Sequence, residues 1–416
     1  PHFTAKPRFV LYSGFRRSTT LKEAEEYKVR SIKGLPHYDE IVLKQSAAHG
    51  GFFNAHAHLD RAYTLADHYL EHVGTTPLKA SNLPLSVKQN LVGDLHVGGP
   101  AYEPADLRAR MAMALERQIA FGVRRIDTNI DATPDLPENG LLAIHIALEL
   151  KKKFKKKGLD VRIAPTPIFG FKTDAKDSIG RWEVFKEAAK VSDYLSLLPE
   201  KDDYAKGADP DGRVGFKHHI RMGLELACTL RKEVQLHVDQ MNVPSEEGSN
   251  RVLDVLEVLH QPDLGRHEPA VWLIHSISPS AYDEKRFRRL VERLLEHNVG
   301  VIVCPTAALT MRQLRSVEGP THNSIARVAE LIKAKVPLRI GTDNISDVFV
   351  PQGDGDMLTE IKVGDMAVRL NLPHIWAKLA CGVPLNNVDI HDVGSALFED
   401  RKACAKTNPI WEPAFE

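Results

Sequence analysis

The chain has 416 residues, of which 43% are hydrophobic, and its 55 basic side chains are balanced by 55 acidic ones. A protein that binds nucleic acid through phosphates needs a basic excess, so the balanced charge argues against this class. The four cysteines form no C-x-x-C pair, which excludes a disulfide framework and a zinc finger and favours a reducing compartment. No apolar run approaches the ~20 residues that cross a bilayer, and no signal peptide is evident. We therefore expect a cytoplasmic protein with no membrane partner.

Eight short apolar segments recur along the chain, and longer helical patterns separate them. The segments are Phe52–Ala55, Val123–Thr128, Val161–Thr166, Tyr194–Leu198, Val234–His237, Val271–His275, Gly300–Cys304 and Leu338–Thr342. Segments that are apolar throughout are typical of parallel strands buried on both faces. The connection from Leu65 to Glu103 is unusually long, and loops of this length are often lids or binding loops.

The helical patterns carry recognisable start and repeat signals. Pro104 stands where a first-turn proline belongs, apolar residues then follow every four positions from Leu107 to Ile119, and Gly122 ends the pattern. Further helices are predicted at about 140–157, 180–190, 215–232, 249–260, 287–295, 322–335 and 356–371. Eight strand-then-helix units predict the α/β class and a (β/α)8 TIM barrel, with a doubly wound open sheet as the alternative.

Side chains that can bind a metal stand at the ends of four predicted strands. His56 and His58 are two apart in the first strand, so their side chains share one face. The fifth, sixth and eighth strands end in His237, His275 and Asp343. The C-terminal ends of all barrel strands form one rim, so these five residues are expected to lie close together.

Three neutral imidazoles and one carboxylate form a nitrogen-rich site for Zn²⁺ or Fe²⁺ that leaves room for a water molecule. The metal lowers the pKa of that water and so creates a hydroxide nucleophile. A neighbouring carboxylate can accept the proton and pass it to a leaving amine, and a further imidazole can orient the attacking oxygen. The pattern predicts a hydrolase whose cofactor is one divalent metal ion, either Zn²⁺ or Fe²⁺.

At these residues the chain resembles the amidohydrolase superfamily, in the branch of cytosine deaminase and N-isopropylammelide isopropylaminohydrolase. The segment His56-Ala57-His58-Leu59-Asp60 is similar to the HxHLD opening of that branch. Six further positions match its D-x3-D-x3-P-x-G-x3-M-L stretch: Asp343, Asp347, Pro351, Gly353, Met357 and Leu358. The second match is the more specific one, and the resemblance covers residues 50–375.

The resemblance implies a role for each residue of the rim. It assigns four residues to the metal: His56, His58, His237 and Asp343. His275 would help to activate the water, and Asp343 would also relay the proton. Binuclear relatives carry a carboxylated lysine at the end of strand four, whereas Lys201 here lies beyond the end of the predicted strand. One metal ion is therefore expected.

Departures from the pattern bear on the substrate. Cytosine deaminase has a glutamate where this chain has Gln240, which cannot donate an acidic proton, although the adjacent Asp239 could replace it. Ile168 stands where the branch uses a glutamine to hold the pyrimidine edge. Asn344 replaces an aspartate of cytosine deaminase and matches the isopropylammelide enzyme. Cytosine itself is therefore not the expected substrate.

Arg61 occupies a position where the isopropylammelide enzyme has a lysine. Its guanidinium could hold a carboxylate or an enolate-like oxygen of the substrate. Alternatively, it pairs with Asp60 or another local acid. The predicted catalytic set is Asp343, His275 and Gln240, and the predicted substrate-binding set is Arg61, Ile168, Asp239, Asn344 and Asp347.

The small β-sandwich that the resemblance implies at the ends of the chain is expected to be reduced or missing. Only short strand candidates occur before the barrel, at Arg8–Tyr12 and Glu40–Leu43, and the tail contains no matching strand. We expect an N-terminal appendage at 1–50 that is a remnant of the small β domain, a barrel at 51–375, and a C-terminal tail at 376–416 that packs on the barrel. Relatives are generally homo-oligomers, so the resemblance also implies a homo-oligomer.

The function predicted from these residues is metal-dependent hydrolysis of a C–N bond in a small-molecule substrate. Deamination of a small nitrogen heterocycle is the first expectation. Hydrolysis of a cyclic or linear amide by the same metal site is an alternative, since Gln240 replaces the acid. A third alternative is a barrel that binds a ligand without catalysis.

Overall fold

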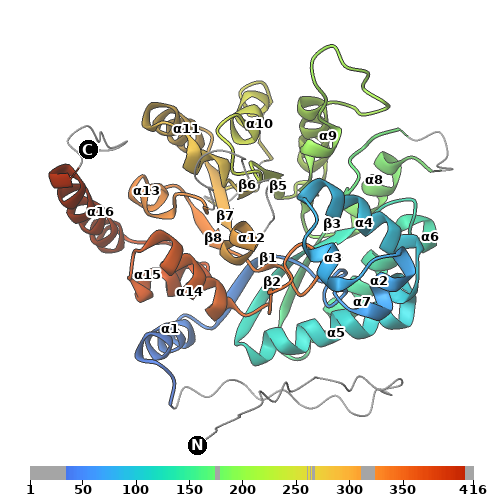
Figure 1. Cartoon of the computed structure of the whole chain (residues 1–416), viewed down its shortest axis with the longest axis horizontal. Coiled ribbons are helices and arrows are strands. Elements are labelled where there is room, and N and C mark those ends of the chain that lie inside the picture. The colour runs from blue at the N-terminus through green and yellow to red at the C-terminus, as the bar shows by residue number, and fades with distance from the viewer. Residues whose placement is uncertain are drawn as a thin grey trace, which may run out of the picture.

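The computed structural model describes residues 34–173, 179–259, 261, 262, 264, 268–310 and 324–407. In this part of the chain, short parallel strands lie at the centre and helices surround them (Figure 1). Among the described residues, no helix is long and apolar enough to cross a membrane. The strand candidate Arg8–Tyr12 lies outside the described residues.

All eight predicted strands are present in two parallel sheets. Their bounds are β1 (Phe52–His58), β2 (Val123–Asp131), β3 (Asp160–Thr166), β4 (Leu195–Leu197), β5 (Val234–Val238), β6 (Val271–His275), β7 (Val299–Val303) and β8 (Leu338–Ile340), and β8 is followed by β9 (Asp343–Asn344). One sheet has the order β3-β2-β1-β9 and the other the order β4-β5-β6-β7-β8. Most positions in these strands are buried, as the apolar segments predict.

The two sheets meet at both edges. On one side, β8 pairs with β7 while β9, three residues further on, pairs with β1, so a single stretch of chain belongs to both sheets. On the other side, the backbone N–H of Asp193, just before β4, donates to the carbonyl of Ile163 in β3 at 2.8 Å. The strands therefore form the (β/α)8 barrel that the eight strand–helix units predict.

The barrel helices cover the strands from outside. They are α5 (Pro104–Ala120), α7 (Leu142–Lys155), α8 (Arg181–Val191), α9 (Phe216–Leu230), α10 (Gly248–Leu256), α11 (Glu284–Glu296), α13 (Val328–Lys333) and α14 (Met357–Val368). In α11, Phe287, Leu290, Val291 and Leu294 are buried, while the arginines and glutamates between them face outward. Asp283 caps this helix by accepting from the N–H of Arg286 at 2.8 Å. Shorter elements connect the units: α6 (Pro137–Gly140), η3 (Pro199–Asp202), η4 (Ser278–Ala281) and α12 (Pro305–Thr310).

The long connection between β1 and α5 is helical. It contains α2 (Asp67–Leu70), η1 (Glu71–Val73), α3 (Pro77–Ser81), α4 (Leu85–Val97) and η2 (Pro100–Tyr102). We call residues 65–103 the helical cover. Most of its helices are one turn long, too short to show a helical repeat in the sequence.

The ends of the described chain are helical as well. They are α1 (His37–Ala48), α15 (Pro373–Ala380) and α16 (Asn387–Thr407), which lie on one side of the barrel (Figure 1). The strand expected at Glu40–Leu43 is wrong, because these residues lie within α1. Val42, Leu43 and Ser46 are buried at helical spacing, and α1 packs on α15.

Candidate active site

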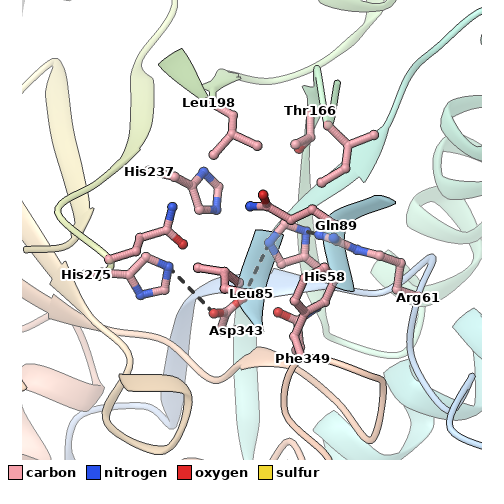
Figure 2. Close-up of a pocket in the computed structure, with 13 residues that line it drawn as sticks. His58, Arg61, Leu85, Gln89, Thr166, Leu198, His237, His275, Asp343 and Phe349 are labelled. Atoms are coloured by element: carbon pink, nitrogen blue, oxygen red, sulfur yellow. Dashed lines mark hydrogen bonds and ion pairs between the residues drawn. The ribbon is translucent and has the colours of Figure 1, made fainter. Parts of the chain in front are cut away.

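Three imidazoles converge at the C-terminal rim of the barrel. His56 and His58 from β1 and His237 from β5 are buried, and one ligand atom of each lies within 4.8 Å of the others. The Nε2 atoms of His56 and His237 are 3.2 Å apart. Figure 2 shows His58, His237, His275 and Asp343 around the same space. The structure thus brings together the histidines that the sequence places hundreds of residues apart.

Asp343 lies in contact distance of the histidine cluster. Its Oδ1 atom is 3.5 Å from Nε2 of His56 and 3.4 Å from Nε2 of His58, and its Oδ2 atom is 3.7 Å from Nε2 of His275. Burial alone would raise the pKa of Asp343, but the bond to His56 and the surrounding histidines outweigh it and hold the pKa below its usual value. The carboxylate is therefore ionised at neutral pH.

The donor set fits a divalent metal ion. Burial is the main cause that holds the pKa values of His58 and His237 well below their usual range and lowers the pKa of His275 to about 4. Nδ1 of His237 lies 3.4 Å from the carbonyl of Leu197, and Nδ1 of His56 lies 3.3 Å from Oε1 of Gln235. The carbonyl of Leu197 favours the proton on Nδ1 of His237, which leaves the Nε2 lone pair of His237 for a metal ion. Nδ1 of His56 lies equally close, at 3.3 Å, to Nδ2 of Asn129.

The backbone turns sharply where the rim residues stand. Asp239, His275 and Asp343 have φ angles of 59°, 76° and 58°, in the left-handed region that residues other than glycine rarely adopt. Each follows or ends a barrel strand, at β5, β6 and β8 respectively. Such conformations cost about 1–3 kcal/mol each and cluster at functional sites.

A pocket of about 400 Å³, counting space open to solvent, lies above the histidines. Its apolar lining residues are Leu85, Ile168, Leu198 and Phe349. Its polar lining residues, besides His58, His237, His275 and Asp343, are Arg61, Gln89, Thr166, Gln240 and Asn344. Of the residues predicted to bind the substrate, Arg61, Ile168 and Asn344 line this pocket, and so does Gln240 of the predicted catalytic set.

Asp239 and Asp347 do not line the pocket. The carboxylate of Asp239 accepts from the backbone N–H groups of Gly248 at 2.6 Å and Ser249 at 2.8 Å, at the start of α10. That of Asp347 accepts from Nδ2 of Asn344 at 2.5 Å. Both carboxylates therefore accept hydrogen bonds from groups of the protein itself. The left-handed backbone at Asp239 directs its side chain toward the start of α10.

Arg61 is held by protein groups. Its Nη2 atom contacts Nδ1 of His58, and its Nε atom lies 3.8 Å from Oδ2 of Asp131. Burial would lower the pKa of Arg61, but Asp131, Asp60 and Asp347 reverse the effect and raise it. The structure pairs Arg61 with a local acid, Asp131, and also places it in the pocket lining, so both roles left open by the sequence fit its position.

Several pocket residues were not predicted. Thr166 and Leu198 stand at the ends of β3 and β4, so their position in a barrel was sufficient to predict them. Leu85 and Gln89 belong to the helical cover and Phe349 to the loop after β9, where no sequence motif marks them.

The short helix η3 contributes two neighbouring charged residues, Glu200 and Lys201. Lys201 is outside the histidine cluster and the pocket lining, and burial lowers its pKa to about 8. Glu200 is partly buried: its Oε2 accepts from Nε2 of Gln240, a pocket residue, at 2.9 Å and its Oε1 from the N–H of Asp239 at 3.0 Å. Burial, Glu246 and Asp239 raise the pKa of Glu200 well above its usual value.

Comparison with known proteins places this geometry in a structural context. No protein-family model matches the chain. An uncharacterized protein of Haemophilus influenzae is 28% identical over 311 residues, which are 73% of this chain and 96% of that protein.

Solved structures resemble the chain in fold. A 5-methylcytosine deaminase from Klebsiella pneumoniae liganded with 5-fluorocytosine has a TM-score of 0.64 at 19% identity, covering 84% of this chain and 74% of its own. An N-isopropylammelide isopropylaminohydrolase from Burkholderia multivorans has a TM-score of 0.56 at 19% identity, covering 84% and 75%. The chain has the (β/α)8 fold of these amidohydrolase-superfamily members. The fold implied by the sequence resemblance is confirmed.

Proposed function

We propose that the protein is a metal-dependent hydrolase that cleaves a C–N bond of a small nitrogen heterocycle and releases an amine or ammonia. The observation that carries the proposal is the rim itself, where three buried imidazoles, an ionised carboxylate and His275 meet at one small pocket. Structural neighbours that act on such rings support it, among them 5-methylcytosine deaminase and N-isopropylammelide isopropylaminohydrolase.

Each residue of the rim has a task in this proposal. His56, His58, His237 and Asp343 would hold the metal ion. Bound Zn²⁺ or Fe²⁺ supplies Lewis acidity and lowers the pKa of a water molecule. Asp343 is ionised, and its two carboxyl oxygens face His58 and His275. It would accept the proton of the water and deliver it to the leaving nitrogen. His275 lies beyond Oδ2 of Asp343 and orients the attacking oxygen.

Hydrolysis of a cyclic or linear amide is the second candidate. It uses the same metal residues and the same proton relay. Gln240 favours it, because a carboxamide at the pocket wall cannot protonate a ring nitrogen as an acid would. In this reaction a carboxylate forms, and the nitrogen of a cyclic substrate stays attached to the product.

The test is metal analysis of the full chain together with turnover assays. We expect one Zn²⁺ or Fe²⁺ per chain and ammonia release from a panel of amino-heterocycles that includes 5-methylcytosine. His237→Ala should abolish both metal retention and turnover. His145→Ala is the matched control, because His145 is an exposed residue of α7.

Other outcomes separate the alternatives. Release of a carboxylate product without ammonia would replace deamination by amide hydrolysis. Less than about half an equivalent of metal and no turnover would favour a ligand-binding barrel. Full activity of His237→Ala with metal retained would refute the site.

A further inference from the structure

The pocket wall contains a carboxamide that comes from outside the barrel. Gln89 lies on α4 of the helical cover, one turn after Leu85, so both side chains share a face and both line the pocket. Figure 2 shows the Gln89 side chain reaching toward the histidines. Its carboxamide makes no hydrogen bond to another described residue. A half-buried donor and acceptor therefore face the pocket.

The position of Gln89 is fixed by the packing of α4. Gly93, one further turn along the helix, lies against the ring of Phe169, and a Cβ atom there would stand 2.7 Å from Cζ of that ring. Phe169 follows Ile168, itself a pocket residue, in the loop after β3. The helix thus rests directly on the barrel rim, and Gln89 is presented from a packed element.

A second carboxamide lines the pocket at the end of β5. Nε2 of Gln240 donates to Oε2 of Glu200 at 2.9 Å, and the other carboxyl oxygen of Glu200 holds the backbone N–H of Asp239. Glu200 is partly buried and accepts a hydrogen bond at each carboxyl oxygen. It therefore acts as a positioning residue for the amide nitrogen of Gln240.

The charge of the pocket does not favour an anionic ligand. Arg61 is the one lysine or arginine among the described lining residues, and its guanidinium contacts His58 and Asp131. Asp60 and Asp347 add two further carboxyl groups around it. Apart from the proposed metal ion, the described pocket lining therefore offers a carboxylate no cation that lacks a protein partner, whereas its carboxamides suit a neutral ligand with its own donors and acceptors.

We propose that Gln89 and Gln240 determine specificity by binding a neutral ring that carries a cyclic amide, with an N–H beside a C=O. A carboxamide has one acceptor and two donor hydrogens at adjacent atoms, which complement such an N–H and C=O pair. A ring without the N–H would leave a buried acceptor unpaired and bind more weakly. This inference rests on the proposed function and names the substrate class of the same site.

The test is calorimetric titration of the Zn²⁺-loaded full chain with uracil and with 1,3-dimethyluracil, in which methyl groups replace both N–H hydrogens. We expect uracil to bind at least about tenfold more tightly. Gln89→Leu should weaken uracil binding by about tenfold and leave the affinity for 1,3-dimethyluracil unchanged. Asn90→Leu is the matched control, because Asn90 is an exposed neighbour on the same helix.

The outcomes distinguish this inference from the proposed function. Equal affinities for the two rings, no binding of uracil to the wild-type chain, or an unchanged uracil affinity in Gln89→Leu would overturn it. Zinc content is measured in every sample, because loss of zinc from the wild-type chain would count against the metal centre instead. Glu200→Leu should also weaken uracil binding with zinc content unchanged, and wild-type affinity in that variant would overturn the role of Glu200.

Discussion

Arg61 shows how one buried side chain connects the metal centre to its surroundings. Its guanidinium contacts His58 on one side and Asp131 on the other, and it is almost completely buried. Asp131 also lies 3.2 Å from Nε2 of His96. Removing a buried cation leaves its acid uncompensated in a medium where charges are poorly solvated.

We therefore expect Arg61→Met to lower the free energy of unfolding by about 3 kcal/mol, because it leaves the buried Asp131 without its arginine partner and with His96 alone. Urea denaturation of the metal-free chain measures the change. Arg61→Lys keeps the charge and should lose less. An unchanged stability, with weaker binding of a carboxylate-bearing ligand, would instead support the role of Arg61 in binding an anion.

The residues of the metal centre could be predicted because their spacing leaves little choice. Residues two apart on a strand share a face, and strand ends in a barrel share a rim, which brings His56, His58, His237 and Asp343 together. Asp239 could not be placed in the same way. One residue beyond the strand, its direction depends on a left-handed φ angle that the sequence does not display.

At the scale of elements, the repeating units were predictable and the cover was not. Most barrel strands are largely apolar and most long helices show a repeat, so local pattern and global fold agree. Within the cover, α2 and α3 have only four and five residues, and the longer α4 begins after Pro84 without a regular apolar stripe. Gln89 was missed for this reason, since its role depends on how α4 packs on Phe169.

The contacts of Asp239 with the start of α10 allow its structural role to be tested separately from a role in substrate binding. Oδ1 of Asp239 accepts from the N–H of Gly248, and Oδ2 accepts from the N–H and the hydroxyl of Ser249. Asp239→Asn replaces one of these acceptors by a donor, so we expect a loss of about 1–2 kcal/mol in the free energy of unfolding. Uracil affinity, measured by calorimetry, should remain unchanged.

The control for this change lies in the same helix. Asp254→Asn alters a partly exposed carboxylate that pairs with Lys217 and Arg293, so its cost should stay below about 1 kcal/mol. A drop in uracil affinity for Asp239→Asn, without loss of stability, would assign Asp239 to the substrate after all.

For the molecule as a whole, the two ends of the barrel have different tasks. The proposed metal site lies at the C-terminal rim, whereas a chain of ion pairs links the first halves of strands in both sheets. Glu233, just before β5, lies 3.1 Å from Arg339 of β8 and 3.5 Å from Arg162 of β3, and Arg162 lies 3.2 Å from Asp127 of β2. This network lies toward the N-terminal end of the barrel, where residues contribute to stability and not to catalysis.

The contribution of this network to stability can be tested with Glu233 and Glu268, because both carboxylates pair with the same arginine, Arg339. Both carboxylates lie 3.1 Å from the guanidinium of Arg339, but the side chain of Glu233 is 2% exposed and that of Glu268 is 59% exposed. Glu233→Gln leaves two buried guanidinium groups short of an anion, so we expect the free energy of unfolding to fall by about 3–5 kcal/mol. Glu268→Gln should cost less than about 1 kcal/mol, because water already screens that pair.

Urea denaturation of both variants measures the difference, and zinc content at low temperature reports on the opposite rim. Since the network and the metal centre lie at different ends of the barrel, the folded Glu233→Gln chain should still bind one zinc ion. Equal stabilities of the two variants would show that the buried pair contributes no more than the exposed one. Loss of zinc from folded Glu233→Gln would show instead that the two ends of the barrel are energetically coupled.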